Sequence, residues 1–99
     1  MLNIRKSIEN ESAVIELEGR LDTVTAPELE TELKASLEGV TGLILDFEKL
    51  EYVSSAGLRV LLSAHKAMSG KGGMKVTNVN EIVREVFDVT GFADILTIE

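Results

Sequence analysis

Hydrophobic and polar residues alternate along the first eighteen positions of the chain. In residues 2–8 every second side chain is apolar except Lys6, and residues 13–18 repeat the alternation after the polar turn of residues 9–12. Two alternating runs joined by a short polar turn predict an antiparallel β-hairpin. A lysine on the apolar side is typical of a strand at the edge of a sheet, so we expect residues 2–8 to form an edge strand.

A helical pattern follows the hairpin. Thr25 and Glu28 have the spacing of a capping box, and Pro27 lies in the first turn, where its missing N–H is not needed. Leucines then recur at helical spacing, at positions 29, 33 and 37. We expect this helix to stop at Gly39.

Strands and helices alternate through the rest of the chain. Residues 43–45 are continuously apolar, which predicts a buried central strand, and residues 47–53 are expected to form a connector. A second helix is predicted from Ala56 to about position 69, ended by the glycine-rich turn at 70–73. We then expect a strand at 74–77, a third helix that Asn80 caps and Gly91 stops, and a weaker final strand at 95–98.

The order of these elements predicts the fold class. Strands that alternate with helices need crossover connections, and crossovers make neighbouring strands parallel. We therefore expect a single α/β domain over residues 1–99, in the order β-β-α-β-α-β-α with a weaker final β. Its sheet should be mixed but mostly parallel, with about four to five strands and the helices packed against it.

The charge balance argues against two kinds of partner. The net charge is −7 at pH 7, whereas nucleic acids and anionic membranes both attract clustered Lys and Arg, so neither is expected as a partner. The chain has no cysteine, which excludes disulfides and thiolate catalysis. We expect a cytoplasmic protein, because the N-terminus lacks a signal pattern and no apolar run approaches the roughly 20 residues of a membrane span.

Ser54 and Ser55 are the candidate nucleophiles. They lie at a turn into a helix, where the serine of a nucleophile elbow would lie, but that motif needs Gly two residues before the serine as well as two after it. The only imidazole belongs to His65, ten residues along the same predicted helix and therefore about 15 Å from Ser55. We expect His65 to be a partly buried helix residue with a satisfied ring, and we expect no catalytic residue in the chain.

The chain also lacks the residues that a metal site or a nucleotide-binding loop needs. One histidine and no cysteine leave only carboxylates, and the glutamates do not have the loop spacing of calcium ligands. The turn at 70–73 contains Lys71, but a P-loop needs Ser or Thr after its lysine and links a strand to a helix, which is the reverse order. No metal and no cofactor are therefore expected.

The serine pair also fits a regulatory switch. Serine is a favoured N-cap, so one of the two is expected to cap the second helix. A serine at an exposed helix N-terminus can also accept a phosphate without damage to its own fold, because the free N–H groups favour the added negative charge. The phosphate brings about −1.5 to −2 units of charge, enough to repel a partner that docks there. The residues alone leave both interpretations open.

Several segments of the chain form a familiar series. They are Gly19-Arg20-Leu21-Asp22, Thr25-Ala26, Leu45-Asp46-Phe47, residues 50–58 and residues 87–92. In their order and spacing, over essentially the whole chain, they resemble the STAS domain, and more narrowly the stand-alone anti-sigma factor antagonists of bacteria.

This resemblance implies a partner switch. In that family the unphosphorylated antagonist binds a serine kinase that doubles as an anti-sigma factor, and so releases the sigma factor. Phosphorylation separates the pair, and a serine phosphatase of the metal-dependent class resets it. The family pattern Asp-Ser-Ser/Ala-Gly-Leu makes Ser55 the phosphate acceptor in this chain. Ser54 stands where the family has Asp, which removes a charge beside the acceptor and makes Ser54 a rival acceptor.

The resemblance also implies which residues form the partner-binding surface. Asp22 matches a family residue that lines this surface. The other expected members surround the start of the second helix: Thr25, Ser54 and Ser55, with Gly57 and Arg59 close by. Gly57 either permits close approach of a backbone or relieves crowding in the first helical turn.

Two other functions remain open. The first is a STAS-like scaffold or switch module outside sigma-factor circuits, in a non-sigma partner-switching, lipid-transport, chemotaxis or secretion system. The second is a small serine hydrolase that uses Ser55, for which the chain lacks a base. The expected oligomeric state is a monomer or a weak dimer.

Overall fold

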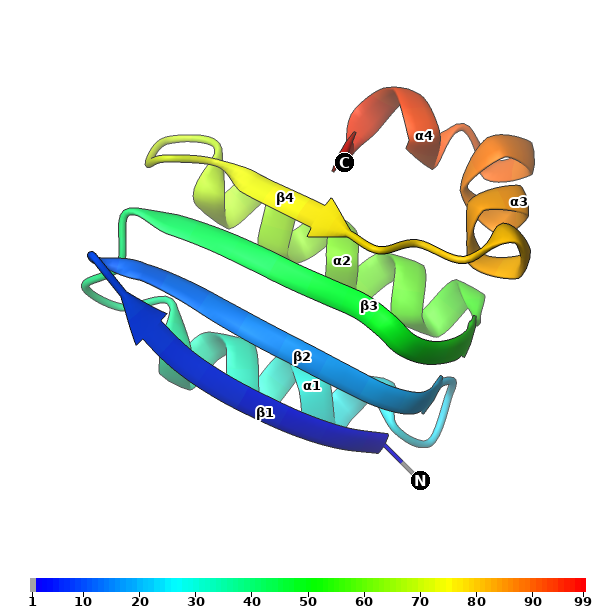
Figure 1. Cartoon of the computed structure of the whole chain (residues 1–99), viewed down its shortest axis with the longest axis horizontal. Helices are drawn as coiled ribbons and strands as arrows, with labels where there is room; N and C mark the ends of the chain where they lie inside the picture. Colours follow the sequence, from blue (N-terminus) through cyan, green and yellow to red (C-terminus); the bar gives the residue numbers. More distant parts are fainter. Residues whose placement is uncertain (1) are drawn as a thin grey trace.

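A mixed five-stranded sheet with helices on one side forms the fold (Figure 1). The computed structural model describes residues 2–99. The strands are β1 (Leu2–Glu9), β2 (Ser12–Leu21), β3 (Gly42–Val53), β4 (Met74–Thr77) and β5 (Thr97–Ile98). The helices are α1 (Ala26–Ser36), α2 (Ser55–Met68), α3 (Glu81–Thr90) and α4 (Phe92–Ile95). The predicted fold class and order are confirmed, with α4 as an additional short helix.

The strands lie in the sheet in their sequence order, β1-β2-β3-β4-β5. β1 and β2 pair antiparallel, as the predicted hairpin requires, and the other neighbours are parallel. β1 lies at one edge, which confirms the prediction for residues 2–8. Its lysine reaches across to the helical layer, where Lys6 Nζ is 4.0 Å from a carboxylate oxygen of Glu32 in α1.

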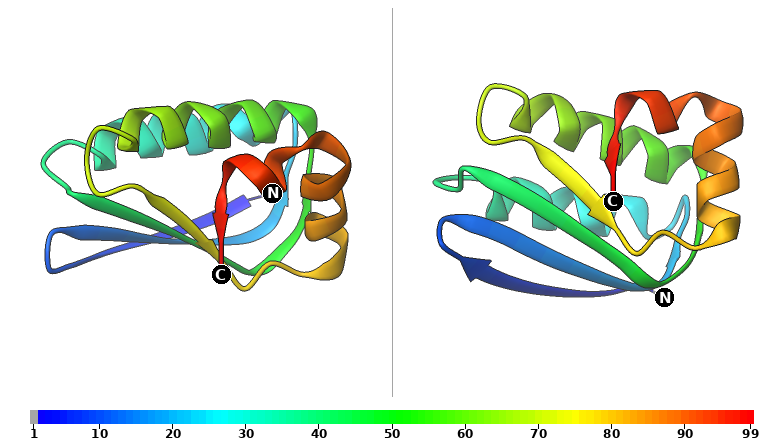
Figure 2. Two further views of the ribbon diagram at one scale, coloured as in Figure 1. Left: turned by 90° about the horizontal axis from the view of Figure 1, so that it is seen from above. Right: turned by 45° about the horizontal axis from the view of Figure 1, so that its top comes forward.

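Both long helices cover the same face of the sheet. The parallel strands β2, β3 and β4 follow one another in one direction, and right-handed crossovers then bring every connecting helix to one side. Figure 2 shows α1 and α2 over this face, with no helix of residues 2–99 on the other. The polar residues of the strands therefore face solvent on the helix-free side.

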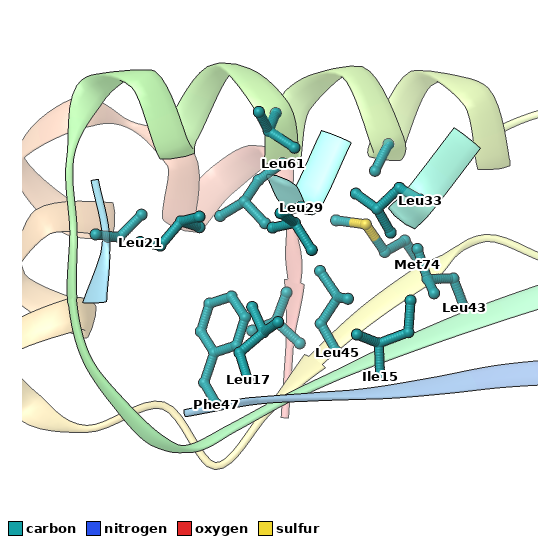
Figure 3. Packing of buried hydrophobic residues seen from close by; sticks show 14 of the residues in the cluster. Ile15, Leu17, Leu21, Leu29, Leu33, Leu43, Leu45, Phe47, Leu61 and Met74 are labelled. Carbon is teal, nitrogen blue, oxygen red and sulfur yellow. The ribbon is translucent and has the colours of Figure 1, made fainter. Parts of the chain in front are cut away.

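The core lies between the sheet and these two helices (Figure 3). Alternate residues of β2 and β3 point inward and meet leucines from α1 and α2, including Leu29 and Leu61. The buried side chains labelled on the strands are Ile15, Leu17, Leu21, Leu43, Leu45, Phe47 and Met74. Leu, Ile and Val dominate because the chain has no Trp and only four aromatic residues, Phe47, Tyr52, Phe87 and Phe92.

The prediction of a connector at 47–53 is wrong, because β3 continues unbroken to Val53. Two register shifts occur along its pairing with β2. Glu16 pairs with Asp46 while Glu18 pairs with Lys49, and Gly19 pairs with Leu50 while Arg20 pairs with Tyr52. Each shift inserts one extra residue into β3, so the alternation of apolar and polar residues that identifies a strand is broken.

Helix boundaries agree with prediction better than their capping details do. Thr25 is the N-cap of α1, but its side chain makes no capping hydrogen bond, so the predicted capping box is wrong. The helix ends at Ser36, and Gly39 follows in the loop with φ of 82°.

The third helix is confirmed at both ends. The side chain of Asn80 accepts a hydrogen bond of 2.8 Å from Val83 N, and Gly91 ends the helix in a left-handed conformation. The predicted strand at 95–98 is shorter than expected, because Phe92–Ile95 form α4 and only Thr97–Ile98 pair with β4.

Candidate functional site

The serine pair lies where β3 leaves the sheet and α2 begins. The loop between β2 and α1 begins at the same edge of the sheet, because the parallel strands β2 and β3 have their carboxyl ends side by side (Figure 1). A backbone hydrogen bond of 2.8 Å from Ser54 N to Leu21 O ties the two connections together. The sequence-predicted residues from positions 22–25 and 54–59 therefore do lie in one region.

Ser54 is the N-cap of α2. Its backbone is extended, with φ of −96° and ψ of 176°, and its side-chain oxygen accepts a hydrogen bond of 3.3 Å from Gly57 N. Its carbonyl accepts the first bond of the helix from Leu58 N at 2.9 Å. The half-buried hydroxyl of Ser54 is thus part of the helix start.

Ser55 is the first residue of α2 and is exposed to solvent. Within residues 2–99 its hydroxyl makes no hydrogen bond, whereas the neighbouring Ser54 hydroxyl does. The two serines therefore differ, because one supports the helix and the other is available to a partner.

Asp22 organises the loop beside the serines. Its Oδ1 atom accepts hydrogen bonds from Thr25 N at 3.1 Å and from Val24 N at 3.0 Å, and it lies 3.2 Å from Thr25 Oγ1. The backbone bond from Thr25 is the main cause that lowers the pKa of the Asp22 carboxyl below its ordinary value of 3.8. The carboxylate is thus held ionised and turned toward its own loop.

Thr25 and Gly57 do not form the surface itself. Thr25 is 3% exposed, and its hydroxyl donates to Arg20 O at 2.8 Å and accepts from Asp22 N at 2.8 Å. Gly57 is buried, and a Cβ at this position would lie 2.7 Å from Leu21 Cγ and 2.9 Å from Val53 Cγ2. Both residues pack behind the surface that Ser55 and Arg59 present, and their part in partner binding stays a prediction.

Sequence reasoning missed Val24, which is 78% exposed at the loop between β2 and α1. The available signal was an apolar residue between two threonines, just before the helix and outside any apolar stripe. A large exposed apolar side chain beside a polar site is a common feature of protein-binding surfaces.

The arrangement does not assemble a hydrolase. Ser55 and His65 lie ten residues apart in the continuous helix α2, which is about 15 Å along its axis. The expected satisfied ring of His65 is also wrong, because its Nδ1 atom is buried without a hydrogen-bond partner among the described residues.

Two surface depressions lie away from the serines. The first is on the helix-free face, where Arg5, Glu16 and Asp46 are among its lining residues. The second is a groove between α1 and α2 that Leu33, Val60 and Ala64 help to line. Within residues 2–99 no three His, Cys, Asp or Glu side chains gather as metal ligands would, and no helix is long and apolar enough to cross a membrane.

The sequence pattern of the STAS domain matches residues 3–99. The chain belongs to the STAS domain family. Among sequence relatives of this STAS domain, BtrV of Bordetella bronchiseptica is 38% identical over 84 residues, which cover 83% of this chain and 72% of BtrV. The anti-sigma-B factor antagonist of Bacillus subtilis is 30% identical over 100 residues, which cover 98% of this chain and 92% of that protein.

Solved structures agree with the STAS fold. An anti-sigma factor antagonist from Mycobacterium paratuberculosis superposes with a TM-score of 0.90 at 22% identity, covering 99% of this chain and 85% of that one. SpoIIAA in its unphosphorylated form gives 0.83 at 23% identity, covering 98% and 88%. The phosphorylated form of Bacillus SpoIIAA gives 0.75 at 22% identity, covering 98% and 91%. At these identities the likeness establishes the fold.

Proposed function

We propose that this STAS domain is an anti-sigma factor antagonist whose binding is switched at Ser55. In its unphosphorylated form it binds an anti-sigma factor that is also a serine kinase, and the sigma factor is released. The relationship to the Bacillus subtilis antagonist over 98% of the chain supports this proposal. SpoIIAA, which has the same fold, exists in unphosphorylated and phosphorylated forms.

One observation carries the choice of Ser55. Its side chain is exposed at the first position of α2 and carries no hydrogen bond within residues 2–99, whereas the Ser54 hydroxyl caps the helix. A phosphate on Ser55 therefore leaves the cap of α2 in place. A phosphate on Ser54 would crowd the half-buried capping position, so the rival acceptor is disfavoured.

The domain itself catalyses no step in this proposal. The partner kinase transfers the γ-phosphoryl group of ATP to Ser55 Oγ, so that an O–P bond forms, ADP leaves and the hydroxyl proton departs. The phosphoserine adds about −1.5 to −2 units of charge at the contact surface, which opposes docking. A serine phosphatase of the metal-dependent class restores the hydroxyl by hydrolysing the O–P bond, and the cycle takes place in the cytoplasm with the sigma factor.

The phosphorylation experiment compares the wild type with Ser54→Ala and Ser55→Ala. Each protein is incubated with ATP and candidate serine kinases of the anti-sigma factor type, and the peptides are analysed by mass spectrometry. We expect one phosphate on Ser55, retained in Ser54→Ala and lost in Ser55→Ala. Absence of phosphate, or phosphate on Ser54 alone, contradicts the proposal.

The binding experiment uses Ser55→Asp, with Ser55→Ala as its control. We expect Ser55→Asp to weaken kinase binding in calorimetry, while its melting temperature stays within about 2 °C of the wild type because the Ser55 side chain is exposed and makes no hydrogen bond within residues 2–99. The unphosphorylated domain is then added to the complex of the kinase and the sigma factor. Size-exclusion chromatography shows whether the sigma factor is released. A domain that binds the kinase but leaves the sigma factor bound would belong to a switch outside sigma-factor circuits.

A further inference from the structure

Arg59 lies one helical turn after Ser55 on the surface of α2. Both residues are exposed and belong to the same continuous helix. Side chains four positions apart on a helix are neighbours, with Cβ atoms about 5–6 Å from one another. The guanidinium is therefore within reach of any group added to the Ser55 hydroxyl.

Arg59 has no other charged partner in the described part of the chain. The ion pairs within residues 2–99 are Lys6–Glu32, Lys75–Glu99 and Arg84–Asp88. Arg59 is also the sole charged residue between positions 54 and 62. The carboxylate of Asp22, in the loop that follows β2, accepts hydrogen bonds from Val24 and Thr25 of that same loop.

We propose that Arg59 forms an ion pair with the phosphate of phosphorylated Ser55 in the same molecule. This inference rests on the proposed function of Ser55. The planar guanidinium can donate two parallel hydrogen bonds to phosphate oxygens. An anion four residues before a cation is also the favourable order along a helix.

The pairing gives the switch a second effect. In the unphosphorylated domain, Arg59 is free to meet an acidic group of the partner beside Ser55. Phosphorylation adds negative charge and at the same time withdraws this positive charge from the surface. The partner therefore loses an attraction as well as meeting a repulsion.

The test measures the phosphate directly and needs no kinase. Phosphoserine is incorporated at position 55 during translation, and the phosphorus NMR signal is titrated with pH in the wild type, Arg59→Gln and Arg59→Lys. We expect the second pKa of the phosphate to be lower by about 0.4 in the wild type than in Arg59→Gln, since a nearby cation favours the dianion. The phosphate pKa in Arg59→Lys should lie between these two values, because lysine keeps the positive charge but cannot donate two parallel hydrogen bonds from a planar group.

Lys66→Gln provides the matched control. It removes the same charge from the last turn of α2, eleven residues from Ser55. We expect its phosphate to titrate as in the wild type. An unchanged pKa in Arg59→Gln, or an equal change in Lys66→Gln, would overturn the pairing.

The phosphate titration and the kinase assay can fail separately, so failure of the pairing is distinguishable from failure of the proposed function. If the pKa depends on Arg59 but no kinase modifies Ser55, the pairing stands and the antagonist proposal fails. If kinases modify Ser55 but Arg59→Gln leaves the pKa unchanged, the antagonist proposal stands and the pairing fails.

Discussion

Gly57 shapes the site without lying on its surface. Since a Cβ here would lie within 3.0 Å of Leu21 and Val53, the first turn of α2 can approach the ends of β2 and β3 only because this residue has no side chain. The close approach keeps Ser54 within hydrogen-bond distance of Leu21 O. Of the two roles left open for Gly57, the structure therefore supports relief of crowding in the first turn of α2, because the atoms that a Cβ would meet belong to side chains of this chain.

The first prediction concerns this contact. We expect Gly57→Ala to lower the free energy of unfolding by about 1–3 kcal/mol, the usual cost of overpacking a core. Urea denaturation followed by circular dichroism measures the change. Gly70→Ala is the control, because a Cβ there meets nothing within 4 Å. Equal effects of the two substitutions would contradict the proposed steric role.

The lowered pKa of Asp22 predicts a pH dependence of stability. Hydrogen bonds to the carboxylate stabilise the folded state fully above pH 3.8, and this contribution is lost as the pH falls through the lower folded-state pKa. Asp22→Asn has no such titration. We therefore expect the stability difference between the wild type and Asp22→Asn, measured in urea at several pH values, to shrink below pH 3.8. A stability difference that grows as the pH falls would contradict a lowered pKa of Asp22 in the folded state.

At the scale of elements, the start of α2 separates two roles. Ser54→Ala removes the N-cap and should cost about 1 kcal/mol of stability, whereas Ser55→Ala should cost close to nothing. Chemical denaturation of the two variants gives the comparison. If Ser55→Ala is as costly as Ser54→Ala, Ser55 supports the fold and is a poor choice for a switch that leaves the fold intact.

Sequence patterns predicted elements well where the residues act locally. Asn80 and Gly91 define α3 because a side-chain cap and a left-handed glycine depend on a few neighbouring positions. The pattern failed over residues 47–53, since the bulges of β3 exist only in its pairing with β2. Four-residue α4 was missed because so short a segment has no measurable period.

The candidate site was predicted in part for the same reason. The positions of Ser54 and Ser55 at a helix start follow from local sequence. Which of them caps, and the burial of Thr25 and Gly57, depend on the loop and strand ends that meet them in space. The exposure of Val24 likewise depends on tertiary structure.

At the scale of the whole molecule, the central strands are held on both sides while the last strand is not. β2 and β3 each pair with two neighbours, whereas β5 contributes two residues at an edge. We expect the amides of Ile15 and Leu45 to exchange with deuterium only on global unfolding, and that of Glu99, which donates to Val76 O at 2.9 Å, to exchange through local opening. Hydrogen-exchange NMR tests this order. Equal protection of Glu99 and Ile15 would contradict it.

The two extra residues of β3 also have a consequence for parity. A regular strand turns its side chains over at every residue, so its buried residues lie two apart. In β3 the buried residues Phe47, Leu50 and Val53 lie three apart, because each bulge takes up one extra residue and leaves the following side chains on the same face. A single residue gained or lost at a bulge should therefore change the length of β3 without exchanging the faces of Val53 and Ser54.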